Sequence, residues 1–164
     1  MDLMAISNAI RLIDWSTLAD IAVVITATFV IWQLREMQRT TQAQAYSVAV
    51  DRLQDEKVRE ARRLIFKLTG KPLEKWSGDE KAAAEVVCHT YDVVGQMVRH
   101  NLLSKKIILD SWGPSLRRSW PILEPLVKNY RQEFSANEFW DDYEWLATEA
   151  IRMDTARAQR TAQR

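Results

Sequence analysis

The chain has 164 residues, with 23 Lys and Arg against 22 Asp and Glu and a formal net charge of +1. This even balance excludes the strongly basic surface that nucleic-acid-binding domains carry. A single cysteine excludes an intramolecular disulfide and fits a reducing compartment. There are only four glycines and four prolines, and apolar residues recur at helical period, so the sequence predicts an all-α protein.

The first segment, residues 1–16, is predicted to be amphipathic. Leu3, Ile6, Ile10 and Ile13 recur at helical spacing, which is typical of a helix with one apolar side. Such a segment either lies at a membrane interface or forms the ordered start of the next helix. The sequence leaves both interpretations open.

An apolar run follows at residues 21–32 (IAVVITATFVIW), which contains no charged residue. Alone it is short, because a spanning helix needs about 20 residues. Extension to residues 18–34 gives 17 residues, of which only Asp20 and Gln33 are strongly polar. Residues 17–20 (TLAD) fit a capping box with Thr17 as N-cap and the Asp20 carboxylate in the first turn.

The free energy of insertion favours a transmembrane helix over residues 17–34. Its large apolar side chains together contribute about −4 kcal/mol, against at most about +3 kcal/mol for one aspartate at the helix centre. Thr26 and Thr28 can bond to their own helix, and Trp15 and Trp32 fall near the two ends, as interfacial aromatic residues do. The predicted membrane anchor comprises Leu18, Ile21, Val24, Ile25, Phe29, Ile31 and Trp32.

Basic residues near the ends of this helix predict an orientation. Arg11 precedes the helix and Arg35 and Arg39 follow it, so the positive-inside rule places the C-terminal side in the cytoplasm. Arg35 and Arg39 are candidate contacts for lipid headgroups. No small-residue cleavage site follows the run, so we expect a retained single-pass anchor rather than a signal peptide.

Residues 35–153 are predicted to form a cytoplasmic bundle of about four to six helices. The bundle begins with a stalk, because residues 33–42 (QLREMQRTTQ) are polar nearly all round. Apolar residues then recur at steps of three and four in residues 43–53, 58–68, 83–98, 116–130 and 139–150. Residues 154–164 lose the apolar side and are predicted to be a flexible tail.

Short motifs predict where these helices begin and end. A break is expected at residues 54–56, and the TGKP motif at residues 69–72 is a strong stop signal. The SGDE and SANE motifs at residues 77–80 and 135–138 fit capping boxes that start helices. Asn101 is predicted to end a helix in the left-handed conformation.

The segment between residues 104 and 130 contains three of the four prolines. Ser104 can cap a short helix, and the WGPS motif at residues 112–115 predicts a turn. Pro121 and Pro125 interrupt the helical pattern that follows, so a kink or two short helices are expected there.

Three stretches carry a resemblance to a known family: residues 91–103 (YDVVGQMVRHNLL), 111–127 (SWGPSLRRSWPILEPLV) and 139–150 (FWDDYEWLATEA). They resemble the bacterial family called domain of unknown function 4760, and the resemblance extends over roughly the whole chain. The positions that carry it are Tyr91, Gly95, Asn101, Trp120 and the run Trp145, Leu146 and Ala147.

The resemblance implies one N-terminal membrane helix and an all-helical cytoplasmic domain, hence the inner membrane of a bacterium as the location. Its motifs are packing motifs, so it implies no active site and no functional residues to carry over.

One face of the helix around residue 89 collects polar groups. Glu85, His89 and Asp92 are spaced at i, i+4 and i+7, which could hold a metal ion or form an acid–base pair. We favour a solvated polar face, and Cys88 beside His89 points elsewhere on the helix. The sequence therefore predicts no catalytic residue, no metal site and no cofactor, and the protein is not expected to be an enzyme.

Two further residue groups have a functional and a structural interpretation. The arginines could contact anionic lipids, but acidic residues lie among them throughout, which favours ordinary surface charge. Four tryptophans could form an interaction patch, but each lies on or beside an apolar stripe, which favours the core. The two groups are Arg62, Arg63, Arg117, Arg118, Arg152, Arg157, Arg160 and Arg164, and Trp112, Trp120, Trp140 and Trp145.

Three functions agree with these features. The first is a non-enzymatic, single-pass membrane protein that acts by protein–protein interaction or self-association, with the lipid bilayer and a protein or second copy as partners. The second is a membrane-perturbing, pore-forming defence or toxin effector. The third is a soluble helical regulator whose apolar run is buried in a dimer.

Overall fold

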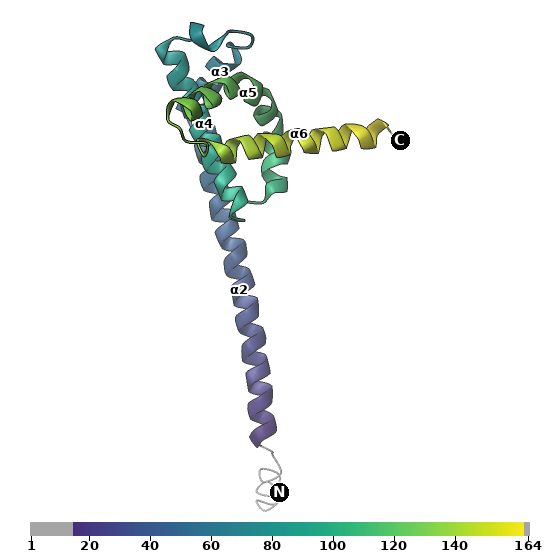
Figure 1. The fold of residues 1–164 in the computed structure, drawn as a ribbon. Coiled ribbons are helices and arrows are strands. Elements are labelled where there is room, and N and C mark those ends of the chain that lie inside the picture. Colours follow the sequence, from purple (N-terminus) through teal and green to yellow (C-terminus); the bar gives the residue numbers. More distant parts are fainter. Residues whose placement is uncertain (1–14, 163–164) are drawn as a thin grey trace, which may run out of the picture. The chain divides into compact units, whose positions relative to one another are not determined.

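The computed structural model describes the backbone of residues 15–162 and the side chains of residues 19–162. This part of the chain is all helical and contains no strand, which confirms the predicted fold class (Figure 1). The elements in chain order are α2 (Trp15–Gln54), α3 (Glu56–Phe66), the short 3-10 helix η1 (Leu73–Lys75), α4 (Gly78–Arg99), α5 (Lys105–Glu133) and α6 (Asp141–Ala162). The predicted amphipathic segment lies almost entirely outside the described residues.

The chain divides into two compact units, Met1–Thr41 and Gln42–Arg164. The first unit contains the apolar part of α2, and the second contains the last part of α2 together with α3 to α6. Thr17 lies inside α2, which already includes Trp15, so Thr17 is not the N-cap that the TLAD motif predicts. The run of helix-forming residues continues on both sides of the motif, so the helix does not begin there.

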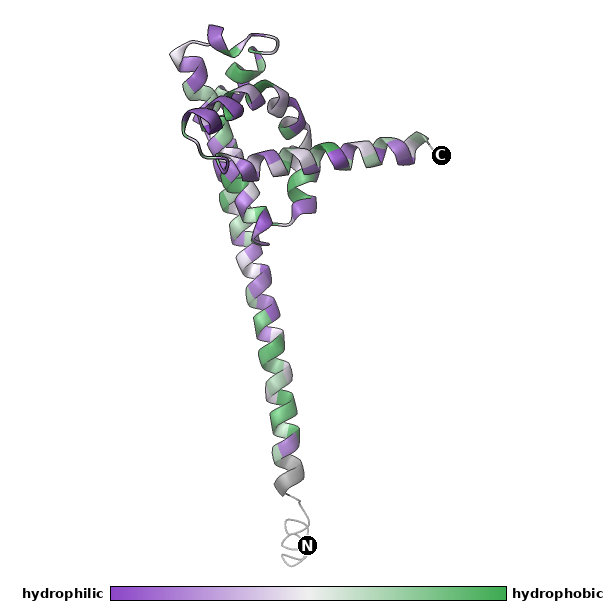
Figure 2. Ribbon diagram, viewed as in Figure 1, coloured by the Kyte–Doolittle hydropathy of each residue, from purple (hydrophilic) through white to green (hydrophobic). Residues whose placement is uncertain are grey.

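Among the residues that the structure describes, no helix combines the length and the apolarity that a membrane crossing requires. The structure therefore gives no support to the transmembrane helix expected at residues 17–34. The expected anchor and the expected stalk instead belong to the single helix α2 (Figure 2).

The second unit has one hydrophobic core, to which each of its α-helices contributes. At its centre α4 and α6 pack together, and α5 packs on α6. α2 takes part through its last turns, where Ala49 and Leu53 are buried. The largest side chains that are almost completely buried are Tyr91, Tyr143, Leu53, Ile65, Ile108 and Leu116.

Several of the local start and stop signals are confirmed. The Ser77 hydroxyl accepts from the Glu80 N–H and the Glu80 carboxylate accepts from the Ser77 N–H, so the capping box at the start of α4 is complete. Asn101 follows α4 with φ of 59°, as the left-handed end predicts. The break after α2 is formed by Asp55, whose carboxylate accepts from the Lys57 N–H at 2.9 Å.

α5 is longer than the sequence predicts. It runs unbroken through Pro114, Pro121 and Pro125, so the turn expected at residues 112–115 is absent from the structure. Figure 1 shows α5 bent along its course, as prolines inside a helix lead one to expect. Each proline removes one helical hydrogen bond. The helix continues because buried residues such as Leu116 and Leu123 hold both sides of the prolines against the core.

The start and end of α6 also differ from the prediction. The SANE motif does not cap it: residues 135–140 form a turn in which Ser135 and Trp140 have φ of 51° and 53°, and α6 begins at Asp141. α6 then continues to Ala162, so residues 154–162 are helical rather than a flexible tail. Two ion pairs to α5 hold this end, Arg117 with Asp154 and Arg157 with Asp110.

Candidate functional site

The apolar stretch of α2 is exposed on every side of the helix. From Ile21 to Leu34 the large apolar side chains are between 46% and 67% exposed. Because neighbouring residues on a helix point about 100° apart, the consecutive Val23, Val24 and Ile25 cover most of its circumference. A helix that is apolar all round is normally buried in protein or in lipid. This stretch is therefore a candidate contact site.

The two threonine hydroxyls of this stretch are bonded within the helix. The Thr26 hydroxyl donates to the Ala22 carbonyl at 2.8 Å, and the Thr28 hydroxyl donates to the Val24 carbonyl at 2.7 Å. Both hydrogen bonds were expected. They leave neither threonine hydroxyl free to line a water-filled pore. The surface that α2 offers here is almost purely apolar.

The predicted anchor residues Ile21, Val24, Ile25, Phe29, Ile31 and Trp32 all lie on this exposed stretch, whereas the side chain of Leu18 is outside the described residues. Phe29 and Trp32 stack with ring centroids 5.7 Å apart. Arg35 and Arg39 follow one and two turns later, and Arg39 lies 3.8 Å from the Glu36 carboxylate. At 81% exposure the Arg39 side chain is free to contact other molecules.

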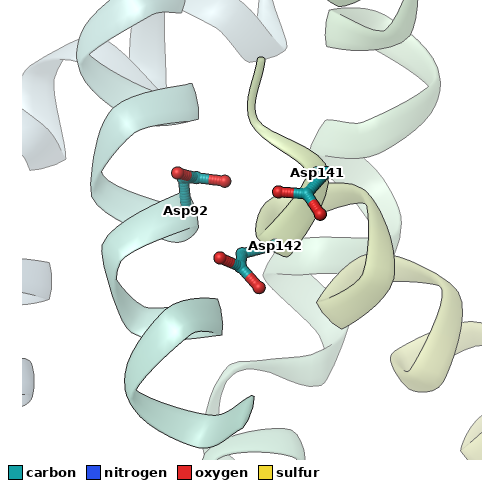
Figure 3. A group of neighbouring side chains, drawn as sticks. All are labelled: Asp92, Asp141 and Asp142. Carbon is teal, nitrogen blue, oxygen red and sulfur yellow. The ribbon is translucent and has the colours of Figure 1, made fainter. Parts of the chain in front are cut away.

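A second candidate site is a group of three carboxylates between α4 and α6. Asp92 of α4 faces Asp141 and Asp142 in the first turn of α6 (Figure 3). One oxygen from each carboxylate lies within 4.8 Å of the others, close enough to share a cation. Each of the three side chains is half-buried.

Neighbouring donors already engage this group. The Asp92 carboxylate accepts from the backbone N–H of Tyr143 at 3.1 Å, which caps the start of α6 from a different helix. Arg99 Nη1 lies 2.9 Å from an oxygen of each of Asp141 and Asp142. Only the contact with Asp141 has hydrogen-bond geometry, and the buried Oδ1 of Asp142 has no hydrogen-bond partner in the described structure.

The backbones approach unusually closely at this point. A Cβ atom added to Gly95 would lie 2.4 Å from the Asp142 carbonyl oxygen, so only glycine fits. Burial raises the pKa of the Asp92 carboxyl, and the charges of Asp142 and Asp141 raise it further, although the Tyr143 N–H acts in the opposite direction. Asp92, Gly95 and Arg99 lie on one side of α4, so we interpret this group as a structural joint that holds the start of α6.

Two tyrosine hydroxyls of the core are each paired with a serine hydroxyl. The Tyr91 and Ser115 hydroxyls are 2.7 Å apart, and those of Tyr143 and Ser119 are 2.8 Å apart. The two tyrosine rings stack at 5.3 Å. Burial raises the pKa of the Cys88 thiol, so the thiol stays protonated and is a poor nucleophile.

The polar face with Glu85, His89 and Asp92 does not converge on one point. Glu85 accepts from the Tyr130 hydroxyl of α5, Asp92 contacts α6, and His89 is exposed. The hydrogen bond to Glu85 raises the pKa of Tyr130 to about 12.

The tryptophans pack as the structural interpretation predicts. Trp120 is buried, and Trp112, Trp140 and Trp145 are partly buried against the core. Cations cover two of them, because Arg62 lies 5.0 Å from the ring centroid of Trp112 and Arg99 lies 5.1 Å from that of Trp145.

Several arginines that the sequence assigns to ordinary surface charge make contacts within the second unit. Arg62 is 9% exposed, and its Nη1 has no hydrogen-bond partner in the described structure. Arg117 pairs with Asp154, and Arg118 lies over the ring of Phe66. The joint residues Arg99, Asp141 and Asp142 were not predicted, because no local motif links residues more than 40 positions apart.

The comparisons with known proteins define the class of this chain. The family model for Domain of unknown function (DUF4760) matches residues 17–150, so the chain belongs to that family. The matched region extends from the apolar part of α2 to the middle of α6. No curated protein and no solved structure matches the chain.

Proposed function

We propose that this protein is a membrane-anchored helical protein that acts by protein–protein interaction or self-association rather than by catalysis. The observation that carries the proposal is the apolar stretch of α2, whose large side chains from Ile21 to Leu34 are exposed on all sides. Exposed apolar surface costs about 25 cal/mol per Å², so a stretch of this size requires a partner. The hydrocarbon of a bilayer is the partner that covers a helix equally in all directions.

The apolar stretch is slightly shorter than the hydrocarbon core of a bilayer is thick. Residues 18–34 span about 25 Å as a helix, against about 30 Å for a typical hydrocarbon core. A helix that is short by this amount is accommodated by local thinning of the bilayer and by long cationic side chains that reach toward the headgroups. Arg35 and Arg39 follow the end of the stretch, where their side chains can reach the headgroups.

The same arginines support an orientation with the helical domain in the cytoplasm of a bacterium, where anionic headgroups attract basic residues next to an anchor. The non-catalytic part of the proposal is supported by two features of the second unit: burial keeps the Cys88 thiol protonated, and the hydroxyls of Tyr91 and Tyr143 are bonded to serines.

Extraction of cell membranes with alkaline carbonate tests the anchor. The full-length chain is expected to stay in the membrane pellet. The anchor variant, Ile25→Lys with Phe29→Lys, is expected in the supernatant, because each lysine at the helix centre adds about 3 kcal/mol to the cost of insertion.

The matched control for this extraction is Val86→Lys with Ile107→Lys, which alters exposed apolar residues of the second unit and should stay in the pellet. Recovery of the wild-type chain in the supernatant would contradict the anchor. Leakage of a dye from vesicles that carry the wild-type chain would instead favour a membrane-perturbing effector.

A further inference from the structure

The turn between α5 and α6 presents exposed aromatic residues. Phe134 is 55% and Phe139 is 36% exposed, and their rings stack with centroids 5.5 Å apart. Glu133 and Glu138 flank the rings, are exposed, and form no ion pair within the described part of the chain. We call Glu133, Phe134, Glu138 and Phe139 the aromatic tip.

Hydrogen bonds from Arg131 support the turn that carries the aromatic tip. Arg131 donates from Nε to the Phe139 carbonyl at 2.9 Å and from Nη1 to the Glu144 carboxylate at 2.6 Å. Ser135 and Trp140 have positive φ, which is uncommon for residues other than glycine and costs free energy. Exposed aromatic rings on a hydrogen-bonded turn lose less entropy on binding than rings on a free loop, which suits a docking element.

A groove with the opposite character lies where the start of α5 meets the later part of α6. Its volume is about 350 Å³. Leu109 and Met153 supply its apolar surface, and three cationic side chains surround them with one carboxylate. The lining residues are Lys105, Lys106, Leu109, Glu149, Arg152 and Met153, and we call them the basic groove.

The charge of the basic groove is only partly neutralised. Glu149 lies 2.8 Å from Lys105 and 2.9 Å from Arg152, so one carboxylate serves two cations. Lys106 forms no ion pair among the described residues. The hydrogen bond from Lys105 lowers the pKa of Glu149, so this carboxylate is charged and neutralises one of the three cations. An aromatic group with neighbouring carboxylates complements the apolar surface and the surplus positive charge of this groove.

The two surfaces belong to the same unit but cannot meet within one chain. The tip precedes Asp141, and Arg152 follows roughly 16 Å later along the straight course of α6. We propose that the aromatic tip of one copy docks into the basic groove of a second copy, so that the chains associate head to tail. This inference deepens the self-association in the proposed function and rests on it.

The arrangement is a heterologous contact, since two different surfaces of the same chain meet. Each copy in such a contact keeps one free tip or one free groove, so association continues beyond the dimer into a ring or an open chain of copies. The acidic residues of the tip argue against a lipid surface as its occupant, because inner-leaflet headgroups are themselves anionic.

The test uses the full-length chain in neutral detergent, with the oligomeric state followed by sedimentation velocity. The tip variant is Glu133→Lys with Glu138→Lys, and the groove variant is Lys106→Glu with Arg152→Glu. The wild type is expected to associate more at higher concentration and less at high salt. Each variant alone is expected to associate about tenfold or more weakly.

Mixing the two variants gives the decisive result. In an equal mixture the normal tip of the groove variant fits the normal groove of the tip variant, and the lysine tip of the tip variant fits the glutamate groove of the groove variant. The mixture is therefore expected to associate again, with the two variants alternating. A chain that carries all four substitutions has both charges reversed and is expected to associate again. Lys57→Glu with Arg63→Glu, which changes the charge equally at exposed positions of α3, is expected to behave as the wild type.

Three outcomes would overturn the inference: a monomeric wild type at every concentration, variants that associate like the wild type, or a mixture that stays monomeric. The anchor variant separates this inference from the anchor itself. Head-to-tail association is expected to persist in Ile25→Lys with Phe29→Lys, whether or not carbonate extracts the wild type. Association that is lost in that variant and kept in the tip variant would assign the contact to α2.

Discussion

The Asp92 side chain accepts a hydrogen bond at a position where a negative charge is unfavourable. Its oxygen accepts the Tyr143 N–H at the start of α6, while burial and the neighbouring Asp141 and Asp142 raise its pKa. A carboxyl whose pKa is higher in the folded than in the unfolded state binds protons on folding. The stability that this gives is present at low pH and is lost as the pH rises through the folded-state pKa.

We therefore expect Asp92→Asn to increase the free energy of unfolding at pH 7. The asparagine oxygen still accepts the Tyr143 N–H, and the buried charge is removed. The gain should shrink as the pH falls toward 3.8, the ordinary value for an aspartate. Urea unfolding of wild type and variant at several values between about pH 3 and pH 7 measures this difference in free energy, because aspartates titrate within that range.

Glu149→Gln is the matched control for this pH dependence. The hydrogen bond from Lys105 lowers the pKa of Glu149, so its charge stabilises the fold above the ordinary pKa of a glutamate and the stability is lost as the pH falls. The control should therefore lose stability at pH 7. A loss of stability in Asp92→Asn at pH 7 would mean that the interaction of the charge with Arg99 outweighs its burial.

At the scale of elements, the contact between α4 and α6 depends on one glycine. Because a Cβ at position 95 would lie 2.4 Å from the Asp142 oxygen and 2.7 Å from its carbon, the two backbones touch directly. The same approach brings Asp92 and Arg99 to the first turn of α6. The lack of a side chain at Gly95 therefore determines how closely α6 can approach α4.

Gly95→Ala is expected to lower the free energy of unfolding by about 2 kcal/mol, because the Cβ would meet backbone atoms that cannot move aside easily. Overpacking costs about 1–3 kcal/mol, and the higher helix propensity of alanine returns up to about 1 kcal/mol of it. The control is Gly113→Ala in α5, where the nearest atom would be Arg117 Nη1 at 3.4 Å and stability should be unchanged or higher. Chemical denaturation measures both, and equal stabilities for the two variants would contradict the close approach.

The elements also show why local sequence rules failed where they did. The SANE motif at residues 135–138 has the residues of a capping box, yet the Tyr143 N–H in the first turn of α6 is capped by Asp92 from another helix. The prolines of α5 were expected to break it, yet its buried side makes one continuous contact with the core. In both cases tertiary contacts outweigh a local preference worth about 1–3 kcal/mol.

At the scale of the whole molecule, the exposed apolar stretch and the hydrophobic core belong to different units. The large apolar side chains of the α2 stretch are exposed, whereas the core lies in the second unit. A substitution in the stretch should therefore change where the protein is found in the cell and leave the stability of the second unit intact.

Thermal unfolding in detergent checks this separation. Ile25→Lys, at a side chain that is 63% exposed, should leave the Tm of the helical domain unchanged. Leu123→Ala, at a completely buried side chain of α5, should lower the free energy of unfolding by about 2–5 kcal/mol and the Tm with it. A large loss of Tm in Ile25→Lys would show that the stretch packs against the domain.

The sequence by itself determined the all-helical fold, the apolar stretch of α2, the capping box at the start of α4 and the left-handed end at Asn101. These features depend on side chains within a few positions of one another, so their interactions can be read along one helix. Only the tertiary structure decided the joint of Asp92, Arg99, Asp141 and Asp142, the course of α5, and the tip and groove of the second unit. Their contacts join residues as far apart as 51 positions, and such pairings arise only when the helices pack.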